Sequence, residues 1–451
     1  MKITPLEKWI SAKIGNGGRP LVREDLRFHQ LQKLRETISR ARARSPFYRK
    51  HLAGVSHDEP ASIEDLRHLP FTTADHLTSD YLGFLCVSQD EISRVVTLPT
   101  SGTTGIPKRI CFTPEDQELT TDFFHHGITT LVGPGDRVLI LLPGERPGSV
   151  GDLLARGLER AGAVGIVHGP VRDVQQTLGV MRKERVSSIV GIPVQVLALA
   201  QYGDISDAPG SVLLSTDYVP ESITRRLEHI WGCKVHTHYG MTEMGFGGAV
   251  ECDARAGYHM READLFFEIV DPETGTPVEP GDWGEIVFTT LTRRGMPLIR
   301  YRTGDISRFL PKPCPCGTIL GTMARVRRRL AGDVVLAEGI RLNMAELDEA
   351  LFRVNGLLDF NAEVTWEGSA SCLQVRVTAA IEAAGSDEAG GTAAISEPPR
   401  ARIETEILLA LDTVAAVQSA KSLGILDVAV RMGGPECPGP RKRTLVDKRR
   451  D

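Results

Sequence analysis

The sequence lacks long apolar runs and any strong excess of one charge. Over 451 residues the formal net charge is −5, so the composition gives no indication of a nucleic-acid or membrane partner. No apolar stretch approaches the roughly 20 residues that a membrane-spanning helix needs. The N-terminal residues MKITPLEKWISAKIGNGGRP contain no continuous apolar segment typical of a secretory signal. We therefore expect a cytoplasmic location.

Cysteine is also scarce, with eight residues in the whole chain. Without a signal peptide, these cysteines are expected to be free thiols or metal ligands rather than disulfides. Cys252 and His259 are separated by six residues, and Cys314 and Cys316 follow in a Cys-Pro-Cys-Gly turn. Three thiolates and one imidazole would make a tetrahedral structural zinc site. Because Cys-x-Cys is tighter than the usual Cys-x-x-Cys spacing, free cysteines in turns are the alternative.

The residues that are present have the composition of a globular protein, with 41% apolar and 25% charged residues. The length suggests two to four domains. Apolar strands at 138–142, 164–168 and 187–190 alternate with helical patterns, which predicts an α/β fold with a parallel sheet covered on both faces. Short alternating strands at 265–270 and 284–288 predict a smaller β-rich subdomain.

The C-terminal part of the sequence predicts a small α+β module. We expect a helix at 344–352, two strands at 362–366 and 373–377, one helix at 402–415 and a strand at 425–430. Residues 380–399 are rich in Ala, Gly, Ser and Glu and contain no aromatic residue, so we expect a mobile loop there.

The most informative segment is Thr100-Ser-Gly-Thr-Thr-Gly-Ile-Pro-Lys108, which follows a short predicted strand. Glycines allow backbone angles that other residues avoid, so consecutive N–H groups can form an anion-binding nest. The hydroxyl groups can donate to phosphate oxygens, and the lysine adds a positive charge. The segment differs from the P-loop pattern of kinases. It predicts a phosphate-binding loop made of Ser101, Gly102, Thr103, Thr104, Gly105 and Lys108.

Further motifs follow in a fixed order. They are His238-Tyr-Gly-Met-Thr-Glu243, Tyr301-Arg-Thr-Gly-Asp305 and the basic stretch Arg325–Asp333. With the phosphate loop, this set resembles the adenylate-forming superfamily of acyl-CoA synthetases, luciferases and adenylation domains. Ser45-Pro-Phe-Tyr-Arg and Phe288-Thr-Thr-Leu-Thr are similar to the phenylacetate–CoA ligase branch. The resemblance covers nearly the whole chain.

The resemblance implies a role for each matching residue. The loop would bind the leaving pyrophosphate, Thr242 would donate to the α-phosphate, and Glu243 would hold Mg²⁺. Tyr239 would stack on adenine, and Asp305 would accept from both ribose hydroxyls. Further residues are expected to contact ATP or AMP. They lie at the end of the predicted strand that precedes Ser215, or beside these motifs, and are Ser215, Thr216, Asp217, Gly240 and Arg325. The acyl pocket is expected near 124–126, 147–151 and 191–193.

The resemblance also implies a domain organisation. Residues 1–328 would form the large N-terminal α/β domain, with the β-rich subdomain at about 250–325. Residues 329–333 would be the hinge, with Gly332 or Asp333 as the pivot, and residues 334–451 the small mobile domain. A catalytic lysine is expected near the C-terminus. Lys442 is the candidate and Arg441 the alternative, because Gly439-Pro-Arg-Lys-Arg departs from the usual Gly-Lys pattern.

The expected function is activation of a carboxylic acid by ATP and transfer of the acyl group to coenzyme A, giving AMP and pyrophosphate. Branch resemblance favours an aryl or arylacetic acid. Two alternatives stay open, namely transfer to a carrier-protein thiol or an amine, and a non-catalytic nucleotide-binding homologue. Four histidines, His125, His126, His236 and His238, are interpreted as packing or pocket residues, because a carboxylate is already ionised at pH 7. The sequence leaves the oligomeric state open, with a homodimer as one alternative.

Overall fold

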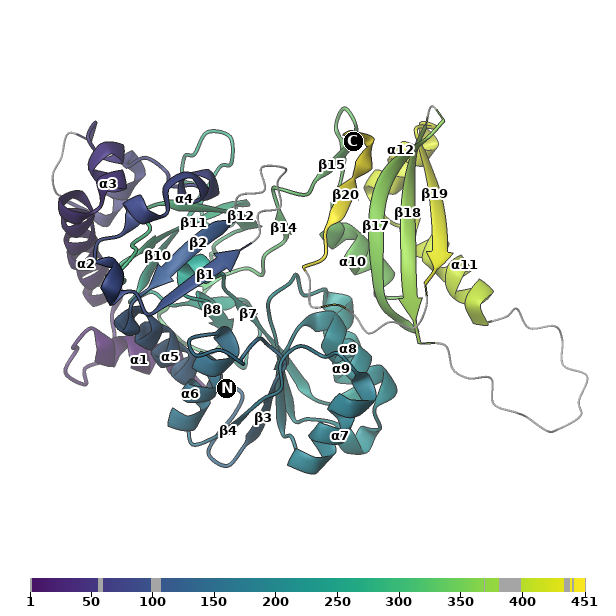
Figure 1. The fold of residues 1–451 in the computed structure, drawn as a ribbon, viewed down its shortest axis with the longest axis horizontal. Helices are drawn as coiled ribbons and strands as arrows, with labels where there is room; N and C mark the ends of the chain where they lie inside the picture. The colour runs from purple at the N-terminus through teal and green to yellow at the C-terminus, as the bar shows by residue number, and fades with distance from the viewer. Residues whose placement is uncertain are drawn as a thin grey trace, which may run out of the picture. The chain divides into compact units, whose positions relative to one another are not determined.

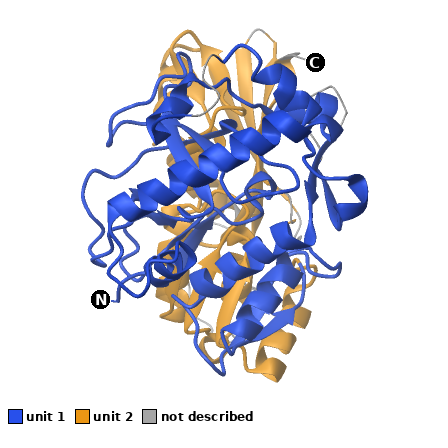
Figure 2. Ribbon diagram, turned by 90° about the vertical axis from the view of Figure 1, so that its left-hand side faces the viewer, with its two compact units in different colours: residues 1–169, 236–327 blue, residues 170–235, 328–451 orange. Residues whose placement is uncertain are grey.

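The computed structural model describes residues 2–55, 60–98, 107–368, 370–380, 399–433, 439 and 442–450. The chain divides into two compact units, which Figure 2 distinguishes by colour. Unit 1 consists of residues 1–169 and 236–327, and unit 2 of residues 170–235 and 328–451. Each unit is therefore assembled from two segments that are distant in the sequence.

Unit 1 begins with helices and continues into strands (Figure 1). Its helices are α1 (Pro5–Lys13), α2 (Arg23–Arg44), α3 (Pro46–His51), α4 (Ala74–Asp80), α5 (Pro114–Ile128) and α6 (Val150–Arg160). Local sequence explains their starting points. Thr113 caps α5 by accepting from the Asp116 N–H, and proline occupies the first helical position, where its missing N–H costs nothing.

The strands of unit 1 form four groups. They are β1 (Arg94–Leu98), β2 (Lys108–Phe112), β3 (Arg137–Ile140), β4 (Val164–Val167), β7 (Lys234–Tyr239), β8 (Ala249–Glu251), β9 (Tyr258–Met260), β10 (Leu265–Val270), β11 (Gly284–Thr290), β12 (Tyr301–Ser307) and β13 (Thr322–Met323). The first two pair antiparallel, and β3 pairs parallel with β4. Neighbouring strands β7, β8, β9 and β13 are antiparallel, as are β10, β11 and β12.

A bulge in β12 matters for the site. Val287 pairs with Arg302 and Glu285 pairs with Ile306, so residues 303–305 of β12 lie opposite a single residue of β11. Gly304 within this bulge has φ 75°, which glycine adopts without strain. Bulges redirect side chains, and this one sets the direction of the Asp305 side chain.

The N-terminal helices hold the start of β12 in place. The buried Tyr48 hydroxyl of α3 accepts a hydrogen bond from the Ile299 N–H at 2.9 Å. The Thr72 hydroxyl donates to the Ile299 carbonyl at 2.6 Å. Apolar side chains from α2, α3, β2, β10, β11 and β12 share one core, so the segment that leads into Tyr301 is fixed from both sides.

Unit 2 combines an α/β segment with the C-terminal module. Its helices are α7 (Val174–Glu184), α8 (Pro193–Tyr202), α9 (Glu221–Trp231), α10 (Met344–Leu351), α11 (Pro399–Leu411) and α12 (Ala415–Ser422). Its strands are β5 (Ser188–Gly191), β6 (Ser211–Leu214), β14 (Arg328–Arg329), β15 (Val334–Ala337), β16 (Ile340–Leu342), β17 (Leu357–Glu367), β18 (Ala370–Ala379), β19 (Leu426–Met432) and β20 (Leu445–Asp447).

The sheet of the C-terminal module has the order β19-β18-β17-β20 (Figure 1). Its central strands β17 and β18 pair antiparallel, while β19 and β20 pair parallel to their neighbours. The buried, parallel pair β5 and β6 lies in the other segment of unit 2. Short 3₁₀ helices complete the described elements, at Ile63–His68, Leu82–Phe84, Gln89–Glu91, Ile205–Asp207, Thr242–Met244 (η5) and Lys448–Arg450.

One predicted helix is present with different bounds. The sequence predicts a helix at 402–415, whereas the structure ends α11 at Leu411 and begins a second helix, α12, at Ala415. Val414 precedes α12 in an extended conformation, with φ −79° and ψ 116°. The β-branched pair Thr413-Val414 has low helix propensity, and both α11 and α12 bury their own apolar side chains. The loop predicted at 380–399 lies largely outside the described residues.

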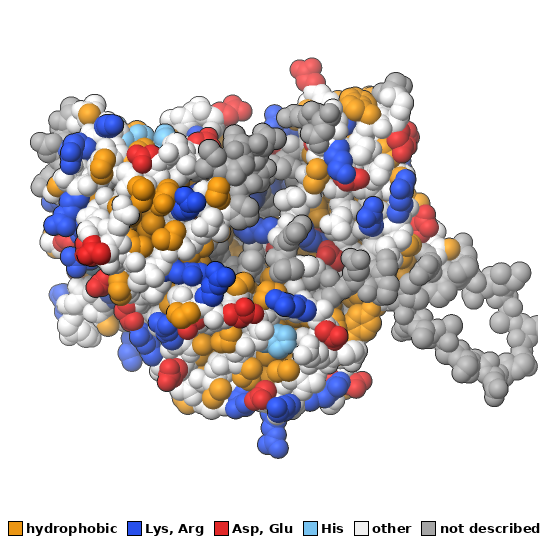
Figure 3. All heavy atoms as spheres, viewed as in Figure 1, with side chains coloured by type: hydrophobic (Ala, Val, Ile, Leu, Met, Phe, Trp, Pro, Cys, Tyr) orange, Lys and Arg blue, Asp and Glu red, His pale blue; other side chains and the backbone are white. Residues whose placement is uncertain are grey.

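The described surface carries charges of both signs. On the face drawn in Figure 3, basic and acidic side chains are interspersed rather than gathered by sign. Within the described ranges, no helix has the length and apolar content that crossing a membrane requires.

Candidate active site

A lysine, a glutamate and a tyrosine from three distant segments meet in unit 1. The Lys108 ammonium at the start of β2 forms an ion pair with the Glu243 carboxylate. The Tyr301 hydroxyl lies 3.2 Å from the lysine Nζ and 3.2 Å from Glu243 Oε1. Only 2% of the glutamate side chain and 14% of the lysine side chain are exposed. A cation and an anion thus share a largely water-free position.

The turn that carries Glu243 is tightly packed. A Cβ at Gly240 would lie 2.0 Å from the Phe246 carbonyl oxygen, so no other residue fits there. The Glu243 carbonyl accepts from Arg293 at 2.8 Å, and the Gly245 carbonyl accepts from the Thr120 hydroxyl at 2.9 Å. These contacts fix the backbone of η5, and with it the direction of the carboxylate.

Tyr239 and Asp305 form a second pair in the same unit. The Tyr239 hydroxyl donates to Asp305 Oδ2 at 3.0 Å, and both side chains are buried. The Asp305 N–H donates to the Thr303 hydroxyl at 3.0 Å, which itself donates to the Ile286 carbonyl at 2.7 Å. The bulge of β12 therefore holds the aspartate rigidly against the end of β7.

Arg325 is held by a buried glutamate. Its guanidinium donates to both oxygens of Glu251, at 2.8 and 3.1 Å, in a bidentate pair. The carboxylate of Glu251 is fully buried and also accepts from the Thr237 N–H at 2.8 Å. The arginine keeps 26% of its side chain exposed, so its position is fixed while part of its surface faces solvent.

The predicted strand end Ser215-Thr216-Asp217 follows β6 in unit 2. Thr216 has φ 81°, a conformation that a β-branched residue adopts only under strain. Such strain is frequent at functional sites. The Asp217 carboxylate accepts from the Tyr218 N–H at 2.9 Å and from the Arg443 N–H at 3.1 Å. This strand end is therefore tied to the C-terminal segment.

Several predicted residues cannot be placed. Ser101, Gly102, Thr103, Thr104 and Gly105 of the phosphate loop, and Arg441, lie outside the described residues. Lys442 is described and exposed, next to Arg443, whose side chain is largely buried.

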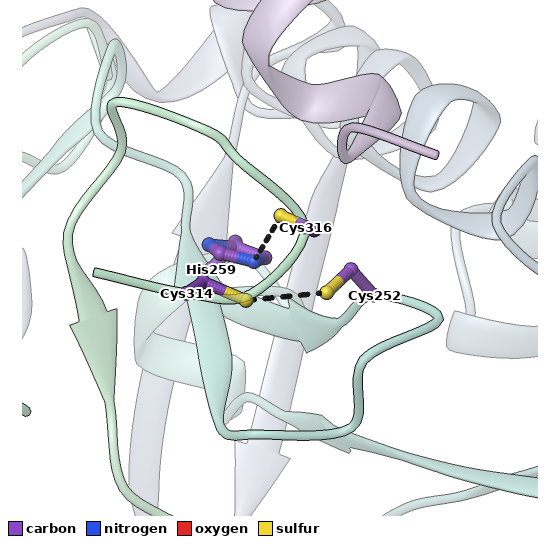
Figure 4. Close-up of side chains that lie close together, drawn as sticks. All are labelled: Cys252, His259, Cys314 and Cys316. Carbon is purple, nitrogen blue, oxygen red and sulfur yellow. Dashed lines mark hydrogen bonds between the residues drawn. The ribbon is translucent and has the colours of Figure 1, made fainter. Parts of the chain in front are cut away.

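The cysteine and histidine residues predicted from their spacing come together in unit 1 (Figure 4). Cys252 follows β8, His259 lies in β9, and Cys314 and Cys316 flank a turn before β13. Their ligand atoms all lie within 4.8 Å of one another, and all four residues are buried. The predicted constellation is thus present in space.

The distances in this cluster fit a metal site better than a disulfide. The sulfurs of Cys252 and Cys314 are 3.6 Å apart, and Cys316 Sγ lies 3.6 Å from His259 Nε2. A disulfide needs about 2.05 Å, whereas sulfur atoms about 2.3 Å from a tetrahedral zinc lie roughly 3.7 Å apart. Burial lowers the pKa of His259 to about 4, so its imidazole is neutral at pH 7. A neutral imidazole is the form that binds metals.

Histidines outside this cluster fit the packing interpretation. The His238 ring lies 6.2 Å from the Phe123 ring and 6.1 Å from the Phe124 ring. Burial lowers the pKa of His238 to about 4. His125 and His126 lie beside Asp122, which also accepts from the Trp9 indole at 2.8 Å.

Sequence reasoning missed several residues of the site. Tyr301 belongs to the same recognised sequence motif as Asp305, so the sequence gave a usable signal for it. Thr120, Glu251 and Arg293 belong to no motif, and only the fold brings them to the site. Arg443 is adjacent to a predicted residue, but nothing in the sequence indicates that it is buried.

Comparison with known proteins agrees with this geometry. A sequence profile of the family described as AMP-binding enzyme matches residues 60–291, just over half of the 451 residues. The chain therefore belongs to the AMP-binding enzyme family. This membership confirms the adenylate-forming superfamily predicted from the motifs.

Relatives place the chain more finely, in the predicted phenylacetate–CoA ligase branch. The phenylacetate–coenzyme A ligase of Thermus thermophilus is 30% identical over 350 residues, which cover 74% of this chain and 77% of the relative. The phenylacetate–coenzyme A ligase of Escherichia coli is 29% identical over 375 residues, covering 78% and 82%.

A solved structure supports the fold. The structure of 2-hydroxyisobutyryl-CoA ligase in complex with 2-HIB-AMP has a TM-score of 0.76 at 21% identity, and the match covers 93% of this chain and 89% of that one. The predicted α/β fold class is confirmed by this similarity.

Proposed function

We propose that the protein is an AMP-forming acid–coenzyme A ligase. A carboxylate oxygen of the acid attacks the α-phosphorus of ATP, pyrophosphate leaves, and an acyl-adenylate forms. The sulfur of coenzyme A then attacks the acyl carbonyl carbon, and AMP leaves. The observation that carries this proposal is the meeting of Lys108, Glu243 and Tyr301 in the unit that also holds the Tyr239–Asp305 pair.

The first step joins two anions, so the site must neutralise charge and fix the reactants. Lys108 would neutralise phosphate oxygens, together with the loop at 101–105. Glu243 would hold Mg²⁺, which supplies further positive charge to the phosphates when bound. Thr242 would donate to the α-phosphate. No base is required, because the acid is ionised at neutral pH.

Nucleoside recognition is assigned to the second pair. Asp305 would accept from the ribose hydroxyls and Tyr239 would stack on adenine. Their hydrogen bond keeps the carboxylate in place before the nucleotide binds. Gly240, Ser215, Thr216, Asp217 and Arg325 are proposed to line the nucleotide site.

The second half-reaction requires access for coenzyme A. We assign residues 329–333 as the hinge of a small C-terminal domain, residues 334–451, that follows the domain of residues 1–328. Lys442, with Arg441 as the alternative, would contact the adenylate phosphate in the first half-reaction and leave in the second. Gly332, with φ 134°, has a backbone conformation that other residues rarely adopt, which suits a pivot.

The substrate class follows from the relatives. We propose an aryl or arylacetic acid, because the curated relatives are phenylacetate–coenzyme A ligases. The test is a panel of carboxylic acids, including phenylacetate, benzoate, 2-hydroxyisobutyrate and acetate, scored by pyrophosphate release. We expect the aryl or arylacetic acids to give the highest rates. No release with any acid would contradict the proposed activity.

Coenzyme A is tested separately as the acceptor. We expect AMP release to become fast and catalytic only when coenzyme A is present. If pyrophosphate release stops after a single turnover even when coenzyme A is present, a carrier-protein thiol or an amine is favoured as the acceptor instead.

We propose a structural zinc ion at Cys252, His259, Cys314 and Cys316. Burial raises the pKa of the Cys252 and Cys314 thiols, so a divalent cation is needed to keep them as thiolates at neutral pH. Four protein ligands would leave no open position, so the site would not take part in the reaction. Elemental analysis should find about one zinc per chain. Cys314→Ser should lose it and Cys233→Ser, a buried cysteine outside the cluster, should keep it.

A further inference from the structure

Arg443 lies next to the proposed catalytic lysine and has an unusual environment within unit 2. Its guanidinium forms an ion pair with Asp348 of α10 and lies 3.3 Å from the Asp359 carboxylate of β17. Its Nε lies 3.8 Å from the Asp217 carboxylate. Only 8% of the arginine side chain is exposed. Three carboxylates surround one cation, so this arginine is held more strongly than a surface residue.

Aromatic rings complete the enclosure. The guanidinium carbon lies 4.6 Å from the centre of the Phe352 ring and 5.0 Å from that of Phe360. A planar cation beside aromatic faces is attracted by the ring electrons, and the rings exclude water from the ion pairs. Asp348 itself is 2% exposed. The arginine is therefore an internal structural element and not part of a solvated basic tail.

The backbone of the same residue reaches the proposed nucleotide site. The Arg443 N–H donates to Asp217 Oδ2 at 3.1 Å. Asp217 directly follows the strained Thr216 at the strand end proposed to line the nucleotide pocket. A second contact supports the connection, since the Tyr218 hydroxyl donates to Glu349 of α10 at 2.8 Å. The strand end and the C-terminal module are thus joined through residues 217, 218, 349 and 443.

The position of Lys442 follows from this arrangement. Consecutive Cα atoms are about 3.8 Å apart, so fixing Arg443 also limits where the preceding residue can lie. On the other side, Leu445 of β20 pairs with Ala362 of β17 and fixes the following residues. The lysine side chain is exposed, while its backbone is adjacent to two anchored points. This arrangement places an exposed cation next to an anchored backbone, as expected for a side chain that must act at one defined place.

We propose that Arg443 and Asp217 form an anchor that positions Lys442 for adenylate formation. The inference rests on the proposed function and extends it to two positioning residues that do not touch the reacting atoms. It also changes the role of Asp217, whose carboxylate holds the C-terminal segment and not the adenine. The anchor must separate when the C-terminal module moves for the thioester step.

Asp217→Ala tests the anchor without removing the pairs of Arg443 with Asp348 and Asp359. The two half-reactions are measured separately. Adenylation is followed by phenylacetate-dependent exchange of pyrophosphate into ATP, and thioester formation by adding coenzyme A to synthetic phenylacetyl-adenylate. We expect about a tenfold lower kcat for exchange, an unchanged KM for ATP and unchanged thioester formation. Arg402→Met, which removes an exposed arginine of α11, is the control and should change neither half-reaction.

Combination with Lys442→Ala distinguishes positioning from direct nucleotide binding. If Asp217 acts only through the lysine, the double variant should be no slower in exchange than Lys442→Ala alone. A raised KM for ATP together with additive losses would overturn the anchor and return Asp217 to the nucleotide pocket. Equal losses in both half-reactions would also overturn it, because they would indicate a general structural defect.

A readout without substrate separates this inference from the proposed function. The quantity measured is the hydrogen–deuterium exchange rate of the Arg443 N–H, followed in a peptide that covers residues 442–450. This rate should be about tenfold faster in Asp217→Ala than in the wild type, because the Arg443 N–H loses its acceptor. Unchanged exchange would refute the anchor whatever the enzyme's substrate is. Failure of the wild type to adenylate any acid would instead refute the proposed function.

Discussion

At the scale of single residues, the carboxylate of Glu243 is the most sensitive point of the site. Glu243→Gln keeps the shape but removes the charge that balances Lys108 and is proposed to hold Mg²⁺. We expect kcat for acid-dependent pyrophosphate exchange to fall at least about 100-fold, as is typical when a charged group that stabilises the transition state is removed. The Mg²⁺ concentration for half-maximal exchange should rise. The measurement is exchange over a Mg²⁺ titration.

Tyr301→Phe is the matched control for that experiment. It removes a single hydroxyl that lies 3.2 Å from both charged groups and leaves the ion pair in place. Loss of one such hydrogen bond costs about 1 kcal/mol, so exchange should fall only about fivefold. A larger effect of the tyrosine than of the glutamate would contradict the assigned roles.

His238 makes stability depend on pH. Burial lowers its pKa from 6.5 to about 4, so the folded state holds the neutral form while the unfolded chain binds a proton below pH 6.5. Its contribution to stability is therefore complete above pH 6.5 and is lost as the pH falls from 6.5 towards 4. The difference corresponds to at most about 3–4 kcal/mol. Urea unfolding at several pH values should show a smaller decrease for His238→Gln. Equal decreases in both proteins would argue against the assignment.

At the scale of elements, the cysteine and histidine cluster joins β8, β9 and the turn before β13. These strands are short, and a metal ion would fix their ends. If zinc binds at about 1,000 times its dissociation constant, it adds roughly 4 kcal/mol. Chelation should therefore lower Tm by about 10 °C, as measured by calorimetry. Cys314→Ser should start at the lower Tm and show no further response to the chelator. Identical Tm values with and without chelator would count against the metal.

The elements also indicate how far the sequence could be interpreted. Strands such as β1 and β10 agree with the prediction, because alternating or apolar runs end at clear turn residues. The sequence predicts residues 191–193 only as part of the acyl pocket, whereas in the structure Pro193 opens α8, where proline is suited to the first position. The sequence predicts β12 only as a motif, because glycine and aspartate, here Gly304 and Asp305, are uncommon in strands. The predicted family and the α/β fold class are nevertheless confirmed.

The candidate site was predictable where chemistry sits in short motifs. Glu243, Asp305 and Lys108 were found because glycine, threonine and charged residues recur in a recognisable order. Arg293 and Glu251 were not, because their role depends on contacts between residues 50 and 74 positions apart. Sequence periodicity carries no information about such contacts. The zinc ligands lie between these cases, since their residue types were informative and only the fold could show that they meet.

At the scale of the whole molecule, the proposed reaction needs two arrangements of the chain around residues 329–333. Asp333 accepts from Arg328 at 2.5 Å. Asp333→Pro would fix φ near −65° and restrict rotation there. We expect exchange of pyrophosphate to stay within about threefold and thioester formation from phenylacetyl-adenylate to fall at least tenfold. Asp333→Ala, which loses the contact but not the freedom of φ, should retain both activities.

The opposite results for Asp333→Pro and Asp217→Ala would be informative as a pair. The first should impair only the step that consumes the adenylate, and the second only the step that forms it. If both variants impaired the same step, a single hinge and a single anchor could not explain the cycle.

The unfavourable φ of Thr216 has a practical consequence for efforts to raise the thermal stability of the protein. Such a conformation costs on the order of 1–3 kcal/mol, and asparagine tolerates it better than threonine. A screen for heat resistance alone would therefore tend to select Thr216→Asn. Because Ser215 and Asp217 flank this residue in the proposed nucleotide site, variants from that screen should be checked for lost turnover before they are kept.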